Sequence, residues 1–260
     1  MKVVLDPEAP VSLFKVDVET NKVIPPPGTP PVINPFDENA LEAALKIKES
    51  QGASITVLSA GRNIPKQIIR KSLAVGADTL VLLEDNTFED LDSYATASIL
   101  AEAINKLGDY DLILCGREAA DTDAGQVGSA IAEILGIPSV TVAKKVEVTD
   151  GKVRVERVTA DGYEVVEASL PALITVSNEL GEPRHATIEG IMAAKRKETI
   201  IWKSADIGAD AAKIGAAGRR SKMLKLFQPV REGKCEMITG ENVEDAAANL
   251  AKKLMEQKLL

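Results

Sequence analysis

The sequence predicts an α/β protein with a doubly wound, mostly parallel sheet, an antiparallel meander and a C-terminal arm. Continuous apolar runs at residues 55–58, 80–83 and 112–114 are typical of strands buried on both faces. The stretches between these runs carry apolar residues at helical spacing. Alternation of this kind builds right-handed βαβ units, whose helices cover both faces of one sheet.

The elements before and within this core follow from local patterns. Residues 14–17 and 22–24 flank a polar turn and predict a small hairpin, and the proline-rich residues 25–31 predict a stiff, extended connector. Helices are expected where apolar residues recur every three or four positions, in most cases with a glycine after the last of them. These positions are residues 37–48, 64–75, 97–107 and 131–135.

The pattern changes after Pro138. Residues 146–148, 152–158 and 163–167 alternate with period two and are separated by Asp-Gly turns, which predicts an antiparallel meander with one solvated face. Residues 173–176 return to a buried-strand pattern, so we expect the meander to be an edge of the same sheet. We therefore expect one α/β domain at 1–203. Residues 204–260 would form a linker and an arm with an amphipathic helix at 243–259.

Composition excludes several classes of function. The 260 residues have a formal net charge of −8, and an acidic chain of this kind lacks the basic surface of a nucleic-acid binder. The single histidine, His185, argues against histidine-rich metal sites and Ser-His-Asp hydrolases. Cys115 and Cys235 form no CxxC pair. Apolar stretches are too short for a signal peptide or a membrane span, so a cytoplasmic protein with no membrane partner is expected.

Three segments are candidates for binding a ligand. In a parallel sheet, ligands bind beyond the carboxyl ends of the strands and near helix starts, where residues 34–37, 92–97 and 116–129 are expected to lie. Small residues in 116–129 would let a phosphate approach the free N–H groups of a helix start. The alternative is an ordinary helix start capped by a side chain. The candidate caps are Thr122, Asp123, Ser93 and Thr96.

The sequence carries no set of residues that would perform acid–base chemistry. It contains neither a Walker A motif nor GxGxxG, and it shows no nucleophile–base pair, recognisable acid pair or metal cluster. A site that binds without reacting fits a nucleotide or redox cofactor, because the organic molecule then supplies the reactivity.

Several motifs resemble the beta subunits of electron-transfer flavoproteins. Residues 155–175 resemble the family signature, with Ala160 in place of the usual acid, and residues 180–194 resemble its recognition loop and following helix, with Gly181 in place of Asn. Residues 6–10 depart from the family's Cys-x-Lys-x-Val opening. Further matches lie at residues 34–36, 76–78 and 123–128. The resemblance implies an adenine-nucleotide-binding (HUP-like) α/β fold at 1–203 and an arm at 204–260 that docks on a partner subunit.

The resemblance also implies cofactors and partners. Beta subunits pair with an alpha subunit that holds an electron-carrying FAD. Their own site holds structural AMP in ordinary members. In bifurcating members it holds a second FAD, which takes a hydride from NADH and sends one electron to ferredoxin or flavodoxin and the other to the alpha-subunit FAD.

Two segments favour FAD over AMP here. Residues 93–97 resemble the hydroxyl-bearing segment of bifurcating members, and residues 125–128 resemble their Ala-Gln-Val-Gly. A pyrophosphate carries more acceptor oxygens than a monophosphate, so extra donors suit it. The implied cofactor contacts are Asn34, Pro35, Phe36, Asp37, Ala60, Ser93, Thr96, Gly116, Asp121, Asp123, Ala124, Gly125, Gln126, Val127 and Gly128.

The recognition loop implies a further partner. Leu180, with Glu182, Pro183 and Arg184, would bind a flavin dehydrogenase, either an acyl-CoA dehydrogenase or an FAD-dependent 2-hydroxyacid dehydrogenase such as a lactate oxidiser. The pattern of residues alone favours a Leu180 that packs inward. The rival interpretations are an ordinary beta subunit with AMP and a nucleotide-binding regulatory module without a redox role. In the favoured interpretation the chain is the electron-transfer subunit of an oxidoreductase complex.

Overall fold

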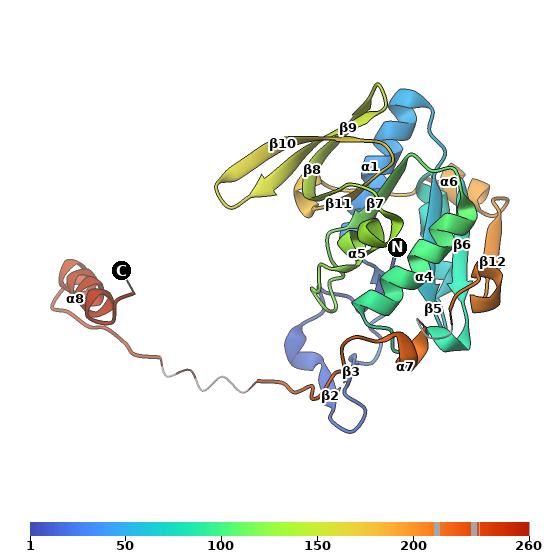
Figure 1. Cartoon of the computed structure of the whole chain (residues 1–260). Coiled ribbons are helices and arrows are strands. Elements are labelled where there is room, and N and C mark those ends of the chain that lie inside the picture. Colours follow the sequence, from blue (N-terminus) through green and yellow to red (C-terminus); the bar gives the residue numbers. More distant parts are fainter. Residues whose placement is uncertain (211–213, 230–232, 234, 260) are drawn as a thin grey trace.

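The computed structural model describes residues 1–210, 214–229, 233 and 235–259 (Figure 1). Its centre is an α/β body built on two groups of parallel strands. One group has the order β12-β6-β5, and the other has β8, β11 and β7 side by side. The strands are β5 (Thr56–Gly61), β6 (Thr79–Glu84), β12 (Thr199–Trp202), β7 (Leu112–Gly116), β11 (Ala172–Val176) and β8 (Ser139–Thr149).

The meander continues the second group of strands, as the sequence predicts. β8 pairs with β11 in parallel and with β9 (Lys152–Thr159) in antiparallel, and β9 pairs with β10 (Gly162–Ser169). Asp150 and Gly151 connect β8 to β9 with φ angles of 50° and 73°. Two positive φ angles in succession are what a type I′ hairpin turn requires, which explains the Asp-Gly pair.

Helices cover both faces of the sheet. In β6, Leu80 and Leu82 pack toward α1 (Pro35–Gln51), while Val81 and Leu83 pack toward α4 (Ser93–Leu107). The other helices of the body are α2 (Lys66–Ile69), α3 (Lys71–Val75), α5 (Val127–Leu135) and α6 (Ile188–Ala194). Because all four of these β6 side chains are fully buried, the strand is a continuous apolar run rather than an alternating one. The doubly wound α/β class is confirmed.

The helix expected at 64–75 is in fact two short helices that meet at Arg70. The Leu73 N–H donates to the Arg70 carbonyl, a spacing of three residues that tightens the chain at the junction. The Arg70 guanidinium donates to the Ala194 carbonyl at 2.7 Å and to the Thr199 hydroxyl. The junction therefore ties this segment to α6 and β12.

The N-terminal segment forms short antiparallel pairs. β1 (Val3–Val4) pairs with β4 (Val32–Ile33), and β2 (Lys15–Asp17) pairs with β3 (Lys22–Ile24) in the expected hairpin. Short 3₁₀ helices lie at η1 (Val11–Leu13), η2 (Asn86–Phe88) and η3 (Asn178–Leu180). In the described part of the chain, no helix is long and apolar enough to cross a bilayer.

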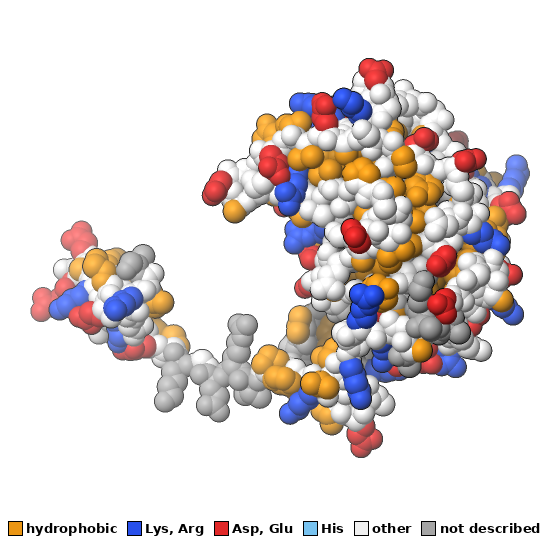
Figure 2. Space-filling view, in the orientation of Figure 1, with side chains coloured by type: hydrophobic (Ala, Val, Ile, Leu, Met, Phe, Trp, Pro, Cys, Tyr) orange, Lys and Arg blue, Asp and Glu red, His pale blue; other side chains and the backbone are white. Residues whose placement is uncertain are grey.

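The chain after residue 203 first packs on the body and then leaves it. η4 (Ser204–Ile207) buries Ile207 against the same cluster as β6 and α4, and Ile214, just before α7 (Gly215–Gly218), packs there too. Contacts of the body therefore continue past the boundary expected at 203. α8 (Val243–Glu256) lies apart from the body in Figures 1 and 2 and buries none of its residues.

Candidate functional site

The predicted cofactor residues gather at one edge of the sheet. Ala60 lies near the end of β5, and Gly116 ends β7. The others lie at the starts of α1, α4 and α5 or in residues 121–126, which lead into α5. Because these strands are parallel and each helix follows a strand, the helix starts lie at the carboxyl edge, where ligands of open α/β sheets bind.

Asn34 shapes the loop that runs from β7 to α5. Its side-chain Nδ2 donates to the Glu118 carbonyl at 2.8 Å, and its Oδ1 accepts from the Ala120 N–H at 3.0 Å. The residue is only 1% exposed. Because both the Nδ2 and the Oδ1 of the amide bond to the backbone of this loop, Asn34 fixes the position of the loop.

Asp37 joins the end of β7 to the N-terminal segment. Its two carboxylate oxygens accept the Gly116 N–H at 2.9 Å and the Lys2 N–H at 2.7 Å. The Lys2 ammonium in turn lies 2.6 Å from the Asp121 carboxylate. A Cβ on Gly116 would lie 2.6 Å from Asp37 Oδ1 and 2.7 Å from the Phe36 carbonyl carbon, so glycine is required for this close approach.

The start of α5 is open. Gln126, the residue before the helix, makes no side-chain cap, and residues 121–126 are exposed. Gly125, with a φ of 61°, turns the chain into the helix. A Cβ on Gly128 would lie 2.6 Å from Thr175 Cγ2, so the helix sits closely on β11. Its first N–H groups carry the positive end of the helix dipole and suit an anion.

The start of α4 differs because it is capped. Asp92 Oδ1 accepts the Ala95 N–H at 2.9 Å, so the cap is neither Ser93 nor Thr96. Burial acts to raise the pKa of Asp92, but hydrogen bonds from the N–H groups of Ala95, Ser221 and Arg220 outweigh it and lower the pKa. In the described part of the chain, the Ser93 and Thr96 hydroxyls make no hydrogen bond and remain free to donate.

The edge offers binding groups and no reactive one. The Cys115 thiol lies in β7, and burial, followed by the negative charge of Asp37, raises its pKa to about 12. It stays protonated at neutral pH and is a poor nucleophile. Among the described residues, no group of three or more His, Cys, Asp or Glu could hold a metal ion.

Comparison with known proteins identifies the family. The electron transfer flavoprotein domain matches residues 28–207. The chain belongs to the electron transfer flavoprotein family, as a beta subunit. It is 40% identical over 247 residues to subunit CarD of a caffeyl-CoA reductase-Etf complex from Acetobacterium woodii, covering 95% of this chain and 94% of that relative.

Two further relatives carry the family name itself. The chain is 42% identical over 228 residues to an electron transfer flavoprotein subunit beta of Thermoanaerobacterium thermosaccharolyticum, covering 87% of each chain. It is 43% identical over 230 residues to one from Clostridium acetobutylicum, covering 88% of each. A beta subunit of this family works with an alpha subunit in an electron-transfer complex.

The predicted recognition loop of this beta subunit is held firmly on α1. Arg184 forms ion pairs with Glu42 and Glu49, and Asn39 Nδ2 donates to the Gly181 carbonyl at 2.7 Å. Leu180 is half-buried and packs against Ala40, Ala43 and Val176. Glu182 is exposed and Pro183 is half-buried. In this structure Leu180 is therefore turned toward α1.

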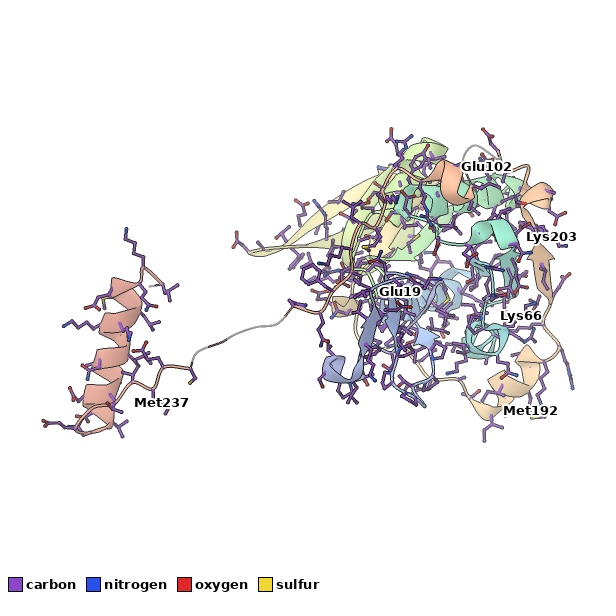
Figure 3. All side chains as sticks on the ribbon, turned by 90° about the horizontal axis from the view of Figure 1, so that it is seen from below. Glu19, Lys66, Glu102, Met192, Lys203 and Met237 are labelled. Atoms are coloured by element: carbon purple, nitrogen blue, oxygen red, sulfur yellow. The ribbon has the colours of Figure 1, made fainter. Side chains whose placement is uncertain are left out.

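Residues just after the loop expose apolar surface that sequence reasoning missed. On α6, the exposed fractions are 80% for Ile188, 49% for Ile191 and 61% for Met192. Met192 projects at the outer edge of the body in Figure 3. The available sequence signal was the cluster of three large apolar residues between positions 188 and 192, directly after the predicted recognition loop.

A hollow of about 1120 Å³ lies between α1 and strands β8 and β9, away from the predicted cofactor residues. Its walls carry charges of both signs that pair with each other, as Lys145 does with Glu147 and Lys144 with Glu156. Such pairing leaves little net charge for an anionic cofactor. The edge at α4 and α5, with its open helix start, is therefore the better candidate.

Proposed function

We propose that this beta subunit binds FAD at the edge formed by the starts of α4 and α5, and that its complex bifurcates electrons from NADH. One electron would pass to ferredoxin or flavodoxin and the other to the FAD of the alpha subunit. The observation that carries the proposal is the pair of free hydroxyls on Ser93 and Thr96 beside the uncapped start of α5. We place this complex in the cytoplasm.

The two helices supply different donors. α4 packs on α5 through Ala97 and Ile131, so the free hydroxyls belong to the neighbour of the open helix start. The N–H groups of α5 suit one phosphate, and the hydroxyls of α4 suit the second. Bound FAD supplies the redox chemistry. The chain itself positions the pyrophosphate, with Asn34 and Asp37 holding the loop that carries Gly125.

AMP is the alternative, and the cap on α4 favours it. The Asp92 carboxylate stands at the start of α4 and would repel a phosphate placed there. If that helix start is closed to anions, only α5 is left for a single phosphate.

Counting cofactors in the purified heterodimer separates the two. FAD in both subunits gives two flavins per heterodimer, whereas AMP in the beta subunit gives one flavin and one AMP. The variant Ser93→Ala/Thr96→Val removes both hydroxyls without removing an intrachain hydrogen bond, so it should lose beta-site flavin and keep the alpha flavin. Thr96→Ser keeps a hydroxyl and should retain the flavin. A parent heterodimer with one flavin contradicts the FAD proposal.

We further propose that the dehydrogenase partner acts on a CoA ester, as an acyl-CoA dehydrogenase does. The name of the Acetobacterium woodii relative, a subunit of a caffeyl-CoA reductase-Etf complex, supports this choice over a 2-hydroxyacid dehydrogenase. The contact would involve loop 180–184 together with the apolar face of α6, and α8 would dock on the alpha subunit. The exposed Ile188 and Met192 support the α6 surface.

The partner surface is tested by two substitutions. Met192→Ser should slow electron delivery to the dehydrogenase, because an exposed apolar anchor is worth about 1.5–3 kcal/mol when buried in a partner. Leu180→Ala should do so only if Leu180 turns outward on binding. NADH oxidation by an artificial acceptor serves as the control and should stay unchanged in both variants. Equal loss of both activities would show a structural defect rather than a docking defect.

A further inference from the structure

The arm crosses the start of α4 as it leaves the body. Asp92 Oδ2 accepts the Arg220 N–H at 2.7 Å, the Ser221 N–H at 2.8 Å and the Ser221 hydroxyl at 3.1 Å. The other oxygen of the same carboxylate caps α4. One side chain therefore joins the cofactor edge to a segment that lies 128 residues further along the chain.

The crossing segment is basic. The Arg220 guanidinium lies 3.5 Å from the centre of the Tyr94 ring, in the first turn of α4. Arg219 Nη2 lies 3.3 Å from Asp90 Oδ2. Arg219, Arg220, Ser221 and Lys222 together line a cavity of about 360 Å³.

Of the three cations that line this cavity, only Arg219 forms an ion pair with a carboxylate in the described part of the chain. Asp90 pairs with Arg219, and Asp92 is taken up by backbone and hydroxyl donors rather than by a guanidinium. In the part of the chain that the structure describes, no carboxylate forms an ion pair with Arg220 or Lys222, and the buried Nε of Arg219 has no hydrogen-bond partner. Cations in such a setting attract a phosphate, which accepts several charge-assisted hydrogen bonds.

We propose that Arg219–Lys222 form a phosphate-binding segment of the arm, which binds the nucleotide cofactor of this subunit together with the hydroxyls of α4. This inference rests on the proposed function, because the ligand is the phosphate part of the same cofactor. The negative charge of the Asp92 cap offsets the positive end of α4, and the basic residues of the cavity supply positive charge in its place. Ser93 and Thr96 then donate neutral hydrogen bonds, and Arg220 and Lys222 neutralise the phosphate.

The proposal makes cofactor binding and the path of the arm interdependent. A phosphate that binds to Arg220 and Lys222 holds the arm at its exit from the body, and Asp92 holds it there through the backbone. By linkage, anything that fixes the arm in this path raises the affinity for the nucleotide, and bound nucleotide restrains the arm by the same free energy.

The test uses the heterodimer freed of its beta-site nucleotide, with FAD, AMP and inorganic phosphate as separate probes. Arg220→Gln/Lys222→Gln should weaken nucleotide binding at least tenfold in titration calorimetry, because each lost charge-assisted bond is worth about a factor of ten. Lys225→Gln is the matched control, because Lys225 belongs to the same arm but lies over the Phe227 ring. In this variant the affinity for nucleotide should change less than twofold. The content of alpha-subunit flavin verifies folding.

A second readout follows the arm itself. Hydrogen exchange at residues 219–226 should slow when nucleotide is added to the parent and should change little in the double variant. Nucleotide that binds the double variant as tightly as the parent overturns this inference and leaves the proposed function standing. A parent heterodimer that binds neither FAD nor AMP overturns both. Inorganic phosphate that protects the arm as well as a nucleotide does would show a general anion site and contradict the nucleotide assignment.

Discussion

The guanidinium of Arg184 donates two hydrogen bonds to the carboxylate of Glu42, from Nε to Oε2 at 2.8 Å and from Nη2 to Oε1 at 3.0 Å. The Glu42 side chain is 6% exposed, whereas that of Arg184 is 35% exposed. Burial acts to raise the pKa of Glu42, but the hydrogen bonds and charge of Arg184 outweigh it, so the pKa is lowered. The loop that follows β11 is thus anchored on α1.

Arg184→Ala should destabilise the chain because it leaves a buried carboxylate without its partner. We expect the free energy of unfolding, measured by urea denaturation, to fall by about 2 kcal/mol, a value reduced from that of a fully buried pair by the exposure of Arg184. Glu49→Gln is the control, since the Glu49 side chain is 59% exposed, and it should change stability by less than about 0.5 kcal/mol. Similar losses in both variants would contradict the buried pair as the anchor.

Asp85 should make stability depend on acid pH. Hydrogen bonds, first from the Thr87 N–H, and also from the Ser204 N–H and hydroxyl, lower its pKa from 3.8 to about 2. A group with a lowered folded-state pKa stabilises the fold above its unfolded pKa and loses that effect as the pH falls through the folded value. Asp85→Asn should therefore be less stable than the parent at pH 7, by about 1 kcal/mol. The gap should close between about pH 4 and pH 2, and a gap that is independent of pH would be against this account.

Gly116 should tolerate no side chain. In Gly116→Ala the new Cβ would meet Asp37 Oδ1 at 2.6 Å and the Asp37 backbone nitrogen at 2.8 Å, so β7 or α1 must shift. We expect a loss of about 1–3 kcal/mol in thermal unfolding, together with weaker nucleotide binding. Gly61→Ala is a matched change at the end of β5, where a Cβ meets only Ile64 Cγ1 at 3.5 Å, and it should be much milder.

The two cysteines should differ in reactivity. Burial, and then Asp37, raises the pKa of the Cys115 thiol to about 12, while Cys235 is exposed. At pH 8, iodoacetamide should modify Cys235 within minutes and leave Cys115 unmodified in the native protein, because the thiolate is the reactive form. Mass spectrometry of the digested protein gives the sites. Rapid native labelling of Cys115 would contradict the raised pKa of its thiol.

The sequence was sufficient for the elements of the core and for their class. Buried runs such as 80–83 predicted strands because a strand covered on both faces carries no polar alternation. The Asp150–Gly151 pair predicted the β8–β9 turn because few other residues adopt two positive φ angles in succession. The helix at 64–75 was predicted as one piece because the contact of Arg70 with Ala194 involves a residue 124 positions away.

Placement within the site was less accessible from the sequence. The positions of Ser93 and Gly125 at or just before helix starts were predicted, since helix starts rich in small and hydroxyl residues have a local signature, whereas their role in binding stays a prediction. Asp92 was not predicted as the cap of α4, although an aspartate before a helix is a common cap. No sequence pattern predicts the stacking of Arg220 on Tyr94, because this contact depends on how the arm folds back across α4.

Helix α1 connects the predicted cofactor edge to the predicted recognition loop. Asp37 at its first turn fastens the cofactor edge, and Glu42 and Glu49 further along carry the recognition loop, all within a rod about 25 Å long. Because one helix carries both sets of contacts, a displacement of α1 moves loop 180–184 and the loop held by Asp37 together.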